Sequence, residues 1–526
     1  MSKEKELTSK EINERSLDLS RFKENILDPY VKGTLIKDIP ADGLAARSLI
    51  PPLTATRRSF AYIGSEIPAF EAEKCVACME CVIQCPDAAI FSRANTADEV
   101  DEALKSVKDP NGRERFKKRF GKTTKLWDVN EKQGKTPAYF SIWIHPDRCK
   151  SCGECVAVCG DHKALSMVPR NETVVEDFRK DIDFISNFLP HSGQDYINDR
   201  LYIDLFMKEK DWIYHGGAGS CSGCGEITAL KMAMTATSTK YGKNFVIVAA
   251  TGCNSVYSST YPYNIWGVPW TNSLFENAPA VALGVRMRLD QEGKKDTKIW
   301  VTGGDGAMLD IGFQSLSRAI ATGRDINILV LDTQVYSNTG GQTSTSTYMG
   351  QISKMSTYGQ SFHGKRERRK ELGPIIMMHP NAFVAQVSPA YYNHFLKTVT
   401  EAIEYPGPSV IIAYSACQPE HGIADDASYE RAKAAVVSRA FPLFVYDPRK
   451  GASLKERLDL KSNPSPKDDW HKDPKTGQLY DFTWFAQGEG RFSKQFTNKK
   501  PSEEIAKSQE DRLNNWHLLQ EMAGLR

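Results

Sequence analysis

Five apolar runs mark the middle of the chain, and helical segments and glycine-rich turns separate them. The runs are NFVIVAAT, TKIWVTGG, INILVLDT, AFVAQV and PSVIIAYS, all between residue 216 and about residue 440. Runs that are apolar on both faces are typical of parallel strands covered by helices on each side. The pattern therefore predicts an alternating α/β domain built on a parallel sheet, in which ligands bind beyond the carboxyl ends of the strands.

The segments on either side have other patterns. Residues 1–65 are polar and broken by prolines, which predicts an arm lying over something else. Residues 66–170 hold two cysteine clusters, each followed by a short strand-like run, AAIFS or KALSMV; the charged stretch RERFKKRFGK between them favours a solvated helical insertion over a basic binding site. We expect a linker over 171–215, and a polar extension over 441–526 that wraps a partner.

The composition narrows the class of protein. A length of 526 residues predicts two or three domains, and 40% hydrophobic with 25% charged residues is ordinary for a soluble globular protein. The balance of 68 basic and 65 acidic residues gives no field that would imply nucleic acid. The N-terminus lacks the apolar region of a signal peptide and no stretch is long enough to span a bilayer, so we expect a cytoplasmic protein without membrane contact.

Eight of the twelve cysteines form two copies of the spacing C-x2-C-x2-C-x3-C, the first followed by Pro86 and the second by Gly160. In this spacing three thiolates bind one cubane and the fourth reaches the other cluster. The expected ligands are Cys75, Cys78, Cys81 and Cys159 for one [4Fe–4S] cluster, and Cys149, Cys152, Cys155 and Cys85 for the second. Two zinc knuckles are the alternative, but they would leave the third and fourth cysteine of each motif awkwardly placed. The spacing therefore predicts a small α+β ferredoxin-like domain with two clusters.

Four cysteines remain in the α/β region, namely Cys221, Cys224, Cys253 and Cys417. Four thiols suffice for one further cubane. Taken alone, Cys253 and Cys417 could each be an ordinary buried cysteine. Each follows a predicted strand, however, and the topology of a sheet could bring them together.

A Gly304-Asp305-Gly306 tripeptide ends one apolar run, and the next run ends at Thr333. A carboxylate, a hydroxyl and a carbonyl from two neighbouring strand ends would hold a hard cation such as Mg²⁺. The glycines would let backbone amides approach a diphosphate at the N-terminus of the following helix. By itself, the tripeptide would be better explained as an ordinary strand-to-helix turn.

The segment GGDGAMLDIGFQSLSRAIATGRDINILVLDTQVYSNTGGQTST closely resembles the thiamine-diphosphate domain of the pyruvate:ferredoxin oxidoreductases. The segments ATGCNSVYSSTYPYN, PWTNSLFENA and IIAYSACQPEHGI match further family segments, so the resemblance covers about residues 60–425. It implies that Asp305, Thr333 and the carbonyl of Val335 bind Mg²⁺. It also implies that Asn338 is a catalytic residue near the thiazolium, and that the four remaining cysteines hold a proximal [4Fe–4S] cluster. Most thiamine enzymes have Asn where this sequence has Thr333, which favours this family over generic thiamine decarboxylases.

The resemblance implies a beta-type subunit of a 2-oxoacid:ferredoxin oxidoreductase. Pyruvate and coenzyme A would become acetyl-CoA and CO₂, and two electrons would pass through three clusters to ferredoxin or flavodoxin. Single-chain members carry a preceding pyrimidine-binding domain that is absent from this sequence, so an alpha-type partner subunit and a hetero-oligomer are expected. Three alternatives stay open: another 2-oxoacid such as 2-oxoglutarate or oxalate, a non-catalytic electron-transfer subunit, and a scaffold whose cysteines bind zinc.

Overall fold

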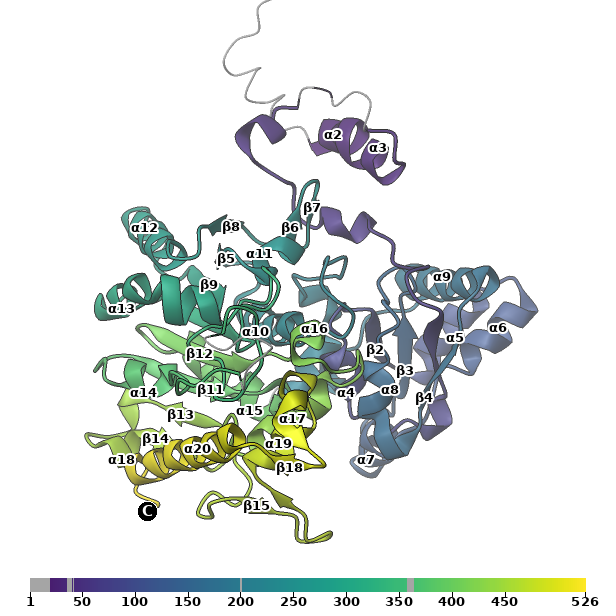
Figure 1. Cartoon of the computed structure of the whole chain (residues 1–526). Coiled ribbons are helices and arrows are strands. Elements are labelled where there is room, and N and C mark those ends of the chain that lie inside the picture. The colour runs from purple at the N-terminus through teal and green to yellow at the C-terminus, as the bar shows by residue number, and fades with distance from the viewer. Residues whose placement is uncertain (1–18, 36–39, 41, 199–200, 357–363) are drawn as a thin grey trace, which may run out of the picture.

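An eight-stranded sheet forms the centre of the larger part of the molecule in the computed structural model (Figure 1). The structure describes residues 19–35, 40, 42–198, 201–356 and 364–526. Among these residues, no helix combines the length and the apolar character needed to cross a membrane. In spatial order the strands are β14 (Leu458–Asp459), β13 (Phe444–Tyr446), β11 (Phe383–Val387), β12 (Ser409–Tyr414), β10 (Asn327–Asp332), β9 (Lys298–Gly304), β5 (Phe245–Ala250) and β8 (Trp270–Ser273).

The strands from β11 to β8 run parallel, β13 pairs with β11 antiparallel, and β14 pairs with β13 antiparallel. The five predicted apolar runs form β5, β9, β10, β11 and β12, so the expected α/β fold class is confirmed. The sequence pattern did not reveal β8, because this edge strand carries the polar residues TNS and is largely exposed.

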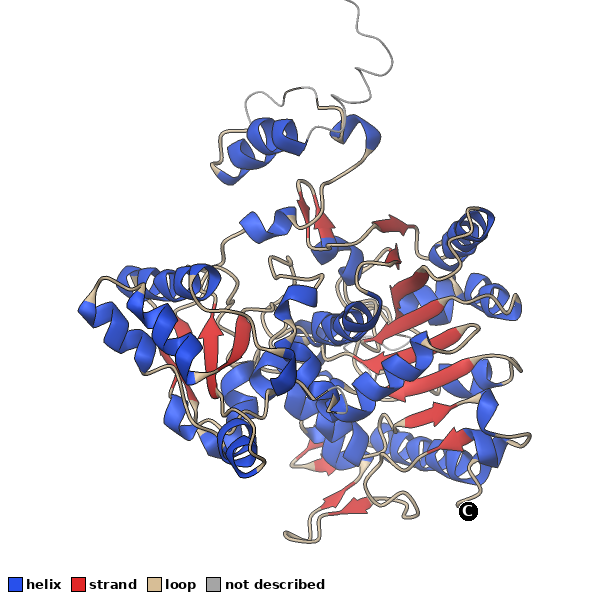
Figure 2. Cartoon of the chain, turned by 180° about the vertical axis from the view of Figure 1, so that it is seen from behind, coloured by secondary structure: helices blue, strands red, loops and turns tan. Residues whose placement is uncertain are grey.

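Helices cover both faces of the sheet (Figure 2). One face packs on α10 (Gly225–Tyr241) and α15 (Tyr392–Ile403), and the other on α12 (Ala278–Gln291), α13 (Phe313–Ala321) and α14 (Leu372–Met377). Successive residues of β10 alternate between the two hydrophobic clusters, with Leu329 and Leu331 in the first and Ile328 and Val330 in the second. Burial on both faces is the physical reason for the continuous apolar runs.

The cysteine motifs lie in a smaller part beside the sheet. Two antiparallel pairs of strands form it, β1 (Glu66–Phe70) with β4 (Leu165–Pro169) and β2 (Ile90–Asn95) with β3 (Tyr139–Ile144), together with the short helices α4 (Glu80–Gln84) and α8 (Glu154–Cys159). The runs AAIFS and KALSMV contribute β2 and β4, as expected. The Gln84 side chain donates to the Pro389 carbonyl at 2.8 Å, and the Tyr214 hydroxyl donates to the Pro86 carbonyl at 3.1 Å, so this part docks tightly on the sheet domain.

The charged insertion is helical, as predicted, with α5 (Ala97–Lys105) and α6 (Pro110–Lys117). Its basic residues are engaged: Arg115 and Arg119 pair with Asp181 at 2.9 and 2.7 Å. Asp181 belongs to α9 (Glu172–Asn187), a helix that occupies much of the expected linker and packs its apolar face into the core. The basic stretch therefore serves the packing of the fold.

The N-terminal arm lies over a hairpin of the sheet domain, β6 (Ser259–Thr260) and β7 (Tyr263–Asn264) (Figure 1). The ring of Phe22 meets that of Tyr261 edge-on at 6.3 Å, and the ring of Tyr30 meets that of Tyr263 at 5.5 Å. The arm thus covers part of this same chain; residues 1–18 of the predicted segment lie outside the described residues.

The last stretch of the chain differs from the expected tail. It contributes β13 and β14 to the sheet, and α19 (Phe482–Gln487) and the long α20 (Glu503–Met522) pack against each other beneath it. Its buried side chains include Phe482, Phe485, Phe492 and Trp516. These residues thus form part of this chain's own core and not a tail, because widely spaced aromatic residues in a polar sequence close that core. The expected contact with a partner stays a prediction.

Candidate active site and cysteine sites

A cavity of about 250 Å³ opens at the carboxyl ends of β5, β9 and β10. Among the residues that line it are the predicted Gly304, Asp305, Gly306, Thr333, Val335 and Asn338. Parallel strands end on the same edge of a sheet, so three loops from distant parts of the sequence meet there. The structure thus brings all the predicted cofactor-binding residues to one site.

Three oxygen atoms converge in this cavity. The Thr333 hydroxyl lies 3.1 Å from the Asp305 carboxylate and 3.0 Å from the Val335 carbonyl oxygen. Neighbouring ligands of an octahedral Mg²⁺ with bonds of about 2.1 Å are about 3.0 Å apart. The spacing and the donor set of carboxylate, hydroxyl and carbonyl therefore fit a bound Mg²⁺.

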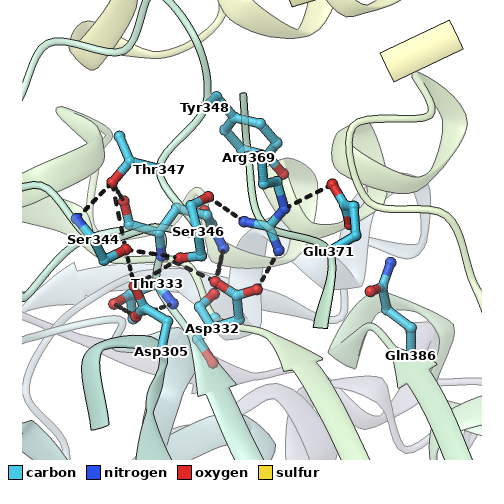
Figure 3. A network of polar contacts seen from close by, with 12 residues as sticks. Asp305, Asp332, Thr333, Ser344, Ser346, Thr347, Tyr348, Arg369, Glu371 and Gln386 are labelled. Carbon is cyan, nitrogen blue, oxygen red and sulfur yellow. Dashed lines mark hydrogen bonds and ion pairs between the residues drawn. The ribbon is translucent and has the colours of Figure 1, made fainter. Parts of the chain in front are cut away.

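Asp305 is held in place by a loop that the sequence did not single out (Figure 3). Its second carboxylate oxygen accepts a hydrogen bond from Ser346 at 2.7 Å and another from Ser344. Burial and the charge of nearby Asp332, partly opposed by the hydroxyl donors, together raise the pKa of Asp305 to about 7. A divalent cation would supply the positive charge that this buried carboxylate lacks.

Two buried cations hold that loop. Lys365 donates to the carbonyls of Ser344, Thr345 and Thr347 at 3.2, 3.1 and 2.8 Å. Arg369 donates to the Ser346 carbonyl and to the Asp332 carboxylate, and it pairs with Glu371 at 3.3 Å (Figure 3). Sequence reasoning missed all of these residues. The serine and threonine run TSTST at residues 343–347, which begins inside the family segment, was the one available signal, because a polar run that is buried needs partners.

The buried Lys365 gives a first testable expectation. Burial and the charge of Arg369 together lower its pKa to about 8, whereas the pKa of an unfolded lysine is about 10.4. Between these values the unfolded state binds more protons, so the free energy of unfolding rises with pH. We expect the urea midpoint of the wild type to rise relative to Lys365→Met between pH 8 and 10. The exposed Lys455→Met is the control, and parallel profiles for wild type and Lys365→Met would contradict the assignment.

The wall of the cavity also holds Cys253 and Asn338, and the Asn338 side chain hydrogen-bonds the Cys253 thiol. Cys253 begins the short helix α11 (Cys253–Ser258) immediately after β5. Burial raises the pKa of Cys253, and neighbouring Glu226, Cys224 and Cys417 raise it further. Cys253 therefore belongs both to the cavity and to a cluster of thiols.

That cluster is assembled by the Cys-Ser-Gly-Cys-Gly segment. Gly223 has φ of +69°, and a Cβ there would lie 1.8 Å from the Asp425 carbonyl oxygen. A Cβ on Gly225 would lie 2.6 Å from the backbone nitrogen of Ala416, beside Cys417. The two glycines thus let this loop approach the end of β12. This explains why glycine stands between the two cysteines, at position 223, and directly after the second, at position 225.

The other eight cysteines divide between two small cavities in the predicted crosswise manner. One cavity is lined by Cys75, Cys78, Cys81 and Cys159, and the other by Cys85, Cys149, Cys152 and Cys155. No group of three or more His, Cys, Asp or Glu side chains in the described ranges is placed to hold a single metal ion. A cubane distributes its four thiolates over four iron atoms, so the ligands of a cluster stand farther apart than those of one ion.

Equivalent residues of both motifs have left-handed backbone conformations. Ala77 and Ser151 have φ of 58° and 65°, and Met79 and Gly153 have φ of 68° and 83°. A left-handed conformation of a residue other than glycine costs energy and is kept where the surroundings demand it. The turn directs the Ala77 amide to the Cys75 sulfur at 3.5 Å, as expected for amides that stabilise thiolates.

Comparison with known proteins agrees with this geometry. Residues 250–413 match the family model described as "Thiamine pyrophosphate enzyme, C-terminal TPP binding domain". The chain is 30% identical over 499 residues to the probable pyruvate-flavodoxin oxidoreductase of Escherichia coli (strain K12), covering 80% of this chain and 40% of that protein. Over about four fifths of its length the chain is similar to members of the pyruvate:ferredoxin oxidoreductase family. The family's Moorella thermoacetica pyruvate:ferredoxin oxidoreductase is 29% identical over 508 residues, covering 79% of this chain and 40% of that protein.

The chain spans about two fifths of the length of these relatives. Among solved structures, a chain of the 2-oxoglutarate:ferredoxin oxidoreductase from Magnetococcus marinus matches with a TM-score of 0.37 and 21% identity, covering 43% of this chain and 72% of that chain. A score of this size bears on neither fold nor substrate.

Proposed function

We propose that this chain is the thiamine-diphosphate and iron–sulfur subunit of a pyruvate:ferredoxin oxidoreductase. With a partner subunit it converts pyruvate and coenzyme A to acetyl-CoA and CO₂, and it passes two electrons singly to ferredoxin or flavodoxin. One observation carries the proposal: the cavity in which the three oxygen atoms converge has Cys253 in its wall. A site for Mg²⁺ and a site for a cluster therefore adjoin.

The residues of the cavity fit thiamine diphosphate bound through Mg²⁺. Asp305, Thr333 and the Val335 carbonyl would hold the ion, and the diphosphate would lie at Gly306, where the π-helical turn η10 (Gly306–Ile311) begins. When bound, thiamine diphosphate supplies the carbanion stabilisation that decarboxylation of a 2-oxoacid requires. Phe275 and Ile311 line the same cavity and would exclude water, and Asn338 would face the substrate.

The three groups of cysteines support an electron path that leads away from this cavity. Cys253 joins the group of Cys221, Cys224 and Cys417 at its wall. The next group is reached through Lys150, which follows Cys149 and donates to the carbonyl and hydroxyl of Ser220 at 2.9 and 3.0 Å. The last group includes Cys75 and Cys78, next to Val76, whose side chain is exposed to solvent. Three [4Fe–4S] clusters at these places would connect the cavity to the surface.

The proposal of a partner rests on the length of the relatives. The relatives are more than twice as long as the region they share with this chain, and a thiamine site requires a second domain for the pyrimidine ring. We propose that an alpha-type subunit supplies that domain together with the groups that bind the substrate carboxylate and coenzyme A.

The experiment is an anaerobic purification of the chain from its native cell, followed by assays of iron, sulfide, thiamine and co-purifying protein. We expect about twelve irons and one thiamine per chain. We further expect coenzyme A-dependent reduction of ferredoxin with pyruvate, compared in parallel with 2-oxoglutarate and oxalate. Clusters without thiamine would make the chain an electron-transfer subunit, and faster turnover of another 2-oxoacid would correct the substrate.

A further inference from the structure

Positive charges, two of them buried (Lys150 and Lys231) and one half-buried (Arg170), surround the middle group of cysteines, formed by Cys85, Cys149, Cys152 and Cys155. Lys150 pairs with Asp87 at 2.7 Å, and both side chains are 2% exposed, so these two charges neutralise each other. Two more cations lie against the ligands themselves, Lys231 and Arg170. Neither Lys231 nor Arg170 forms an ion pair with a carboxylate among the described residues.

Lys231 reaches the group from helix α10. It is 2% exposed, and its ammonium donates to the Val82 carbonyl at 2.9 Å and to the Cys85 carbonyl. These carbonyls end helix α4, where the helix dipole is negative. No carboxylate in the described ranges forms an ion pair with Lys231. A full positive charge therefore stands beside a predicted ligand of the middle cluster.

Arg170 reaches the group from the other side, just after β4. One guanidinium nitrogen donates to the Cys149 sulfur at 3.2 Å. The other donates to the carbonyls of Phe60, Ala61 and Cys149 at 3.2, 2.9 and 3.2 Å, so main-chain atoms fix the direction of the first. This is a charge-assisted hydrogen bond to a sulfur atom, with no carboxylate in the contact.

Among the residues that the structure describes, no lysine or arginine lines the cavity of the neighbouring group, formed by Cys75, Cys78, Cys81 and Cys159. Its cavity is lined mainly by apolar side chains such as Phe70 and Phe140. Glu80 acts on Cys78 by its charge and accepts a hydrogen bond from Tyr392 at 3.0 Å. The middle group also has a nearby carboxylate, Glu154, but two backbone amides at the start of α17 (Ser428–Val437) satisfy it. The hydrogen bond from the Arg170 cation to a sulfur atom is thus made to the middle group, while Lys231, beside Cys85, also acts by its charge on Cys81 of the neighbouring group.

We propose that Lys231 and Arg170 raise the reduction potential of the middle cluster and so keep it reducible in a buried position. The proposal rests on the proposed function. Reduction adds one electron and one negative charge to the cluster; the electron comes from the group of Cys224 and leaves to the group of Cys75. Burial disfavours that added charge, and a cation or a hydrogen bond at the sulfur offsets the cost. Without these cations the middle cluster would be a barrier between the other two.

The test is a redox titration of the anaerobically purified complex, monitored by electron paramagnetic resonance at each potential. Lys231→Met keeps most of the side-chain volume and removes the charge. We expect the equilibrium constant for reduction of one cluster to fall at least tenfold, which lowers its reduction potential by about 59 mV for one electron. The potentials of the other two clusters should change less. Lys240→Met, the same change on the same helix at an exposed position, and Lys231→Arg, which keeps the charge, are expected to titrate as the wild type.

Iron and sulfide contents separate the failure of this inference from that of the proposed function. A wild-type chain without clusters would refute the proposed function. A fully loaded Lys231→Met chain with wild-type potentials would overturn only the role of Lys231. If the Lys231→Met chain does not bind its clusters, the Arg170→Gln variant is titrated instead. We expect the same fall in the reduction potential of one cluster. Unchanged potentials in loaded Arg170→Gln, or loss of the cluster from both variants, would overturn the proposal in favour of a structural role.

Discussion

Asp305→Asn is expected to abolish binding of thiamine diphosphate while the chain still folds. The carboxylate is 1% exposed, and its oxygen lies 3.1 Å from the Thr333 hydroxyl at the proposed Mg²⁺ site. An amide has nearly the same shape but no charge for the ion. Losing an outer partner of a metal ligand commonly costs 10–100-fold in affinity, so losing the ligand itself should cost more than about 100-fold. Thiamine diphosphate affinity at fixed Mg²⁺, measured by calorimetry, checks this.

The control is Asp310→Asn in the same turn. Asp310 accepts hydrogen bonds from the Tyr336 hydroxyl at 2.7 Å and the Thr345 amide at 3.1 Å, away from the three converging oxygen atoms. We expect the Asp310→Asn variant to bind thiamine diphosphate with an affinity within a few-fold of that of the wild type. The thermal midpoint of the chain without cofactor should not fall in Asp305→Asn, because the change removes a buried charge whose pKa is already raised. Full affinity in Asp305→Asn would refute the assigned Mg²⁺ site.

Arg369→Met is expected to cause the largest loss of stability. Both side chains of the pair Arg369 and Asp332 are buried, at 2% and 0% exposure, and Arg369 also holds the Ser346 carbonyl (Figure 3). Removing one partner leaves an unpaired buried charge, which costs about 3–5 kcal/mol. The urea midpoint of the sheet domain, followed by tryptophan fluorescence, should fall accordingly. Thiamine affinity should fall as well, because the loop that orients Asp305 loses its anchor.

Arg368→Met is the matched control, since its side chain is 73% exposed and its contact with Asp511 is 3.5 Å long. A surface pair of this kind contributes about 0–1 kcal/mol. The double variant Arg369→Met with Asp332→Asn should recover part of the lost stability, because no bare carboxylate remains. Equal losses of stability in Arg368→Met and Arg369→Met would show that the buried pair contributes no more to the free energy of unfolding than the surface pair.

Local pattern alone was enough to predict five strands of the sheet and the grouping of eight cysteines. The runs that became β5, β9, β10, β11 and β12 are apolar throughout because both of their faces are covered, and this condition is visible in a single sequence. The cysteine spacing similarly predicted the crosswise grouping in two cavities, since a short spacing restricts the geometry of the loop. Asp305 and Thr333 could be placed at one edge because parallel strands end on the same side.

Only the tertiary structure decided what supports these residues. Ser346, Lys365 and Arg369 lie on a loop whose sequence has no periodicity, and their roles depend on which buried carboxylate they face. The segment 441–526 appeared to be a polar tail, yet its scattered aromatic residues complete the core. The position of Lys231 beside Cys85 joins residues of two separate parts of the fold. Contacts between distant segments depend on packing, and local sequence carries little information about which buried charge will meet which partner.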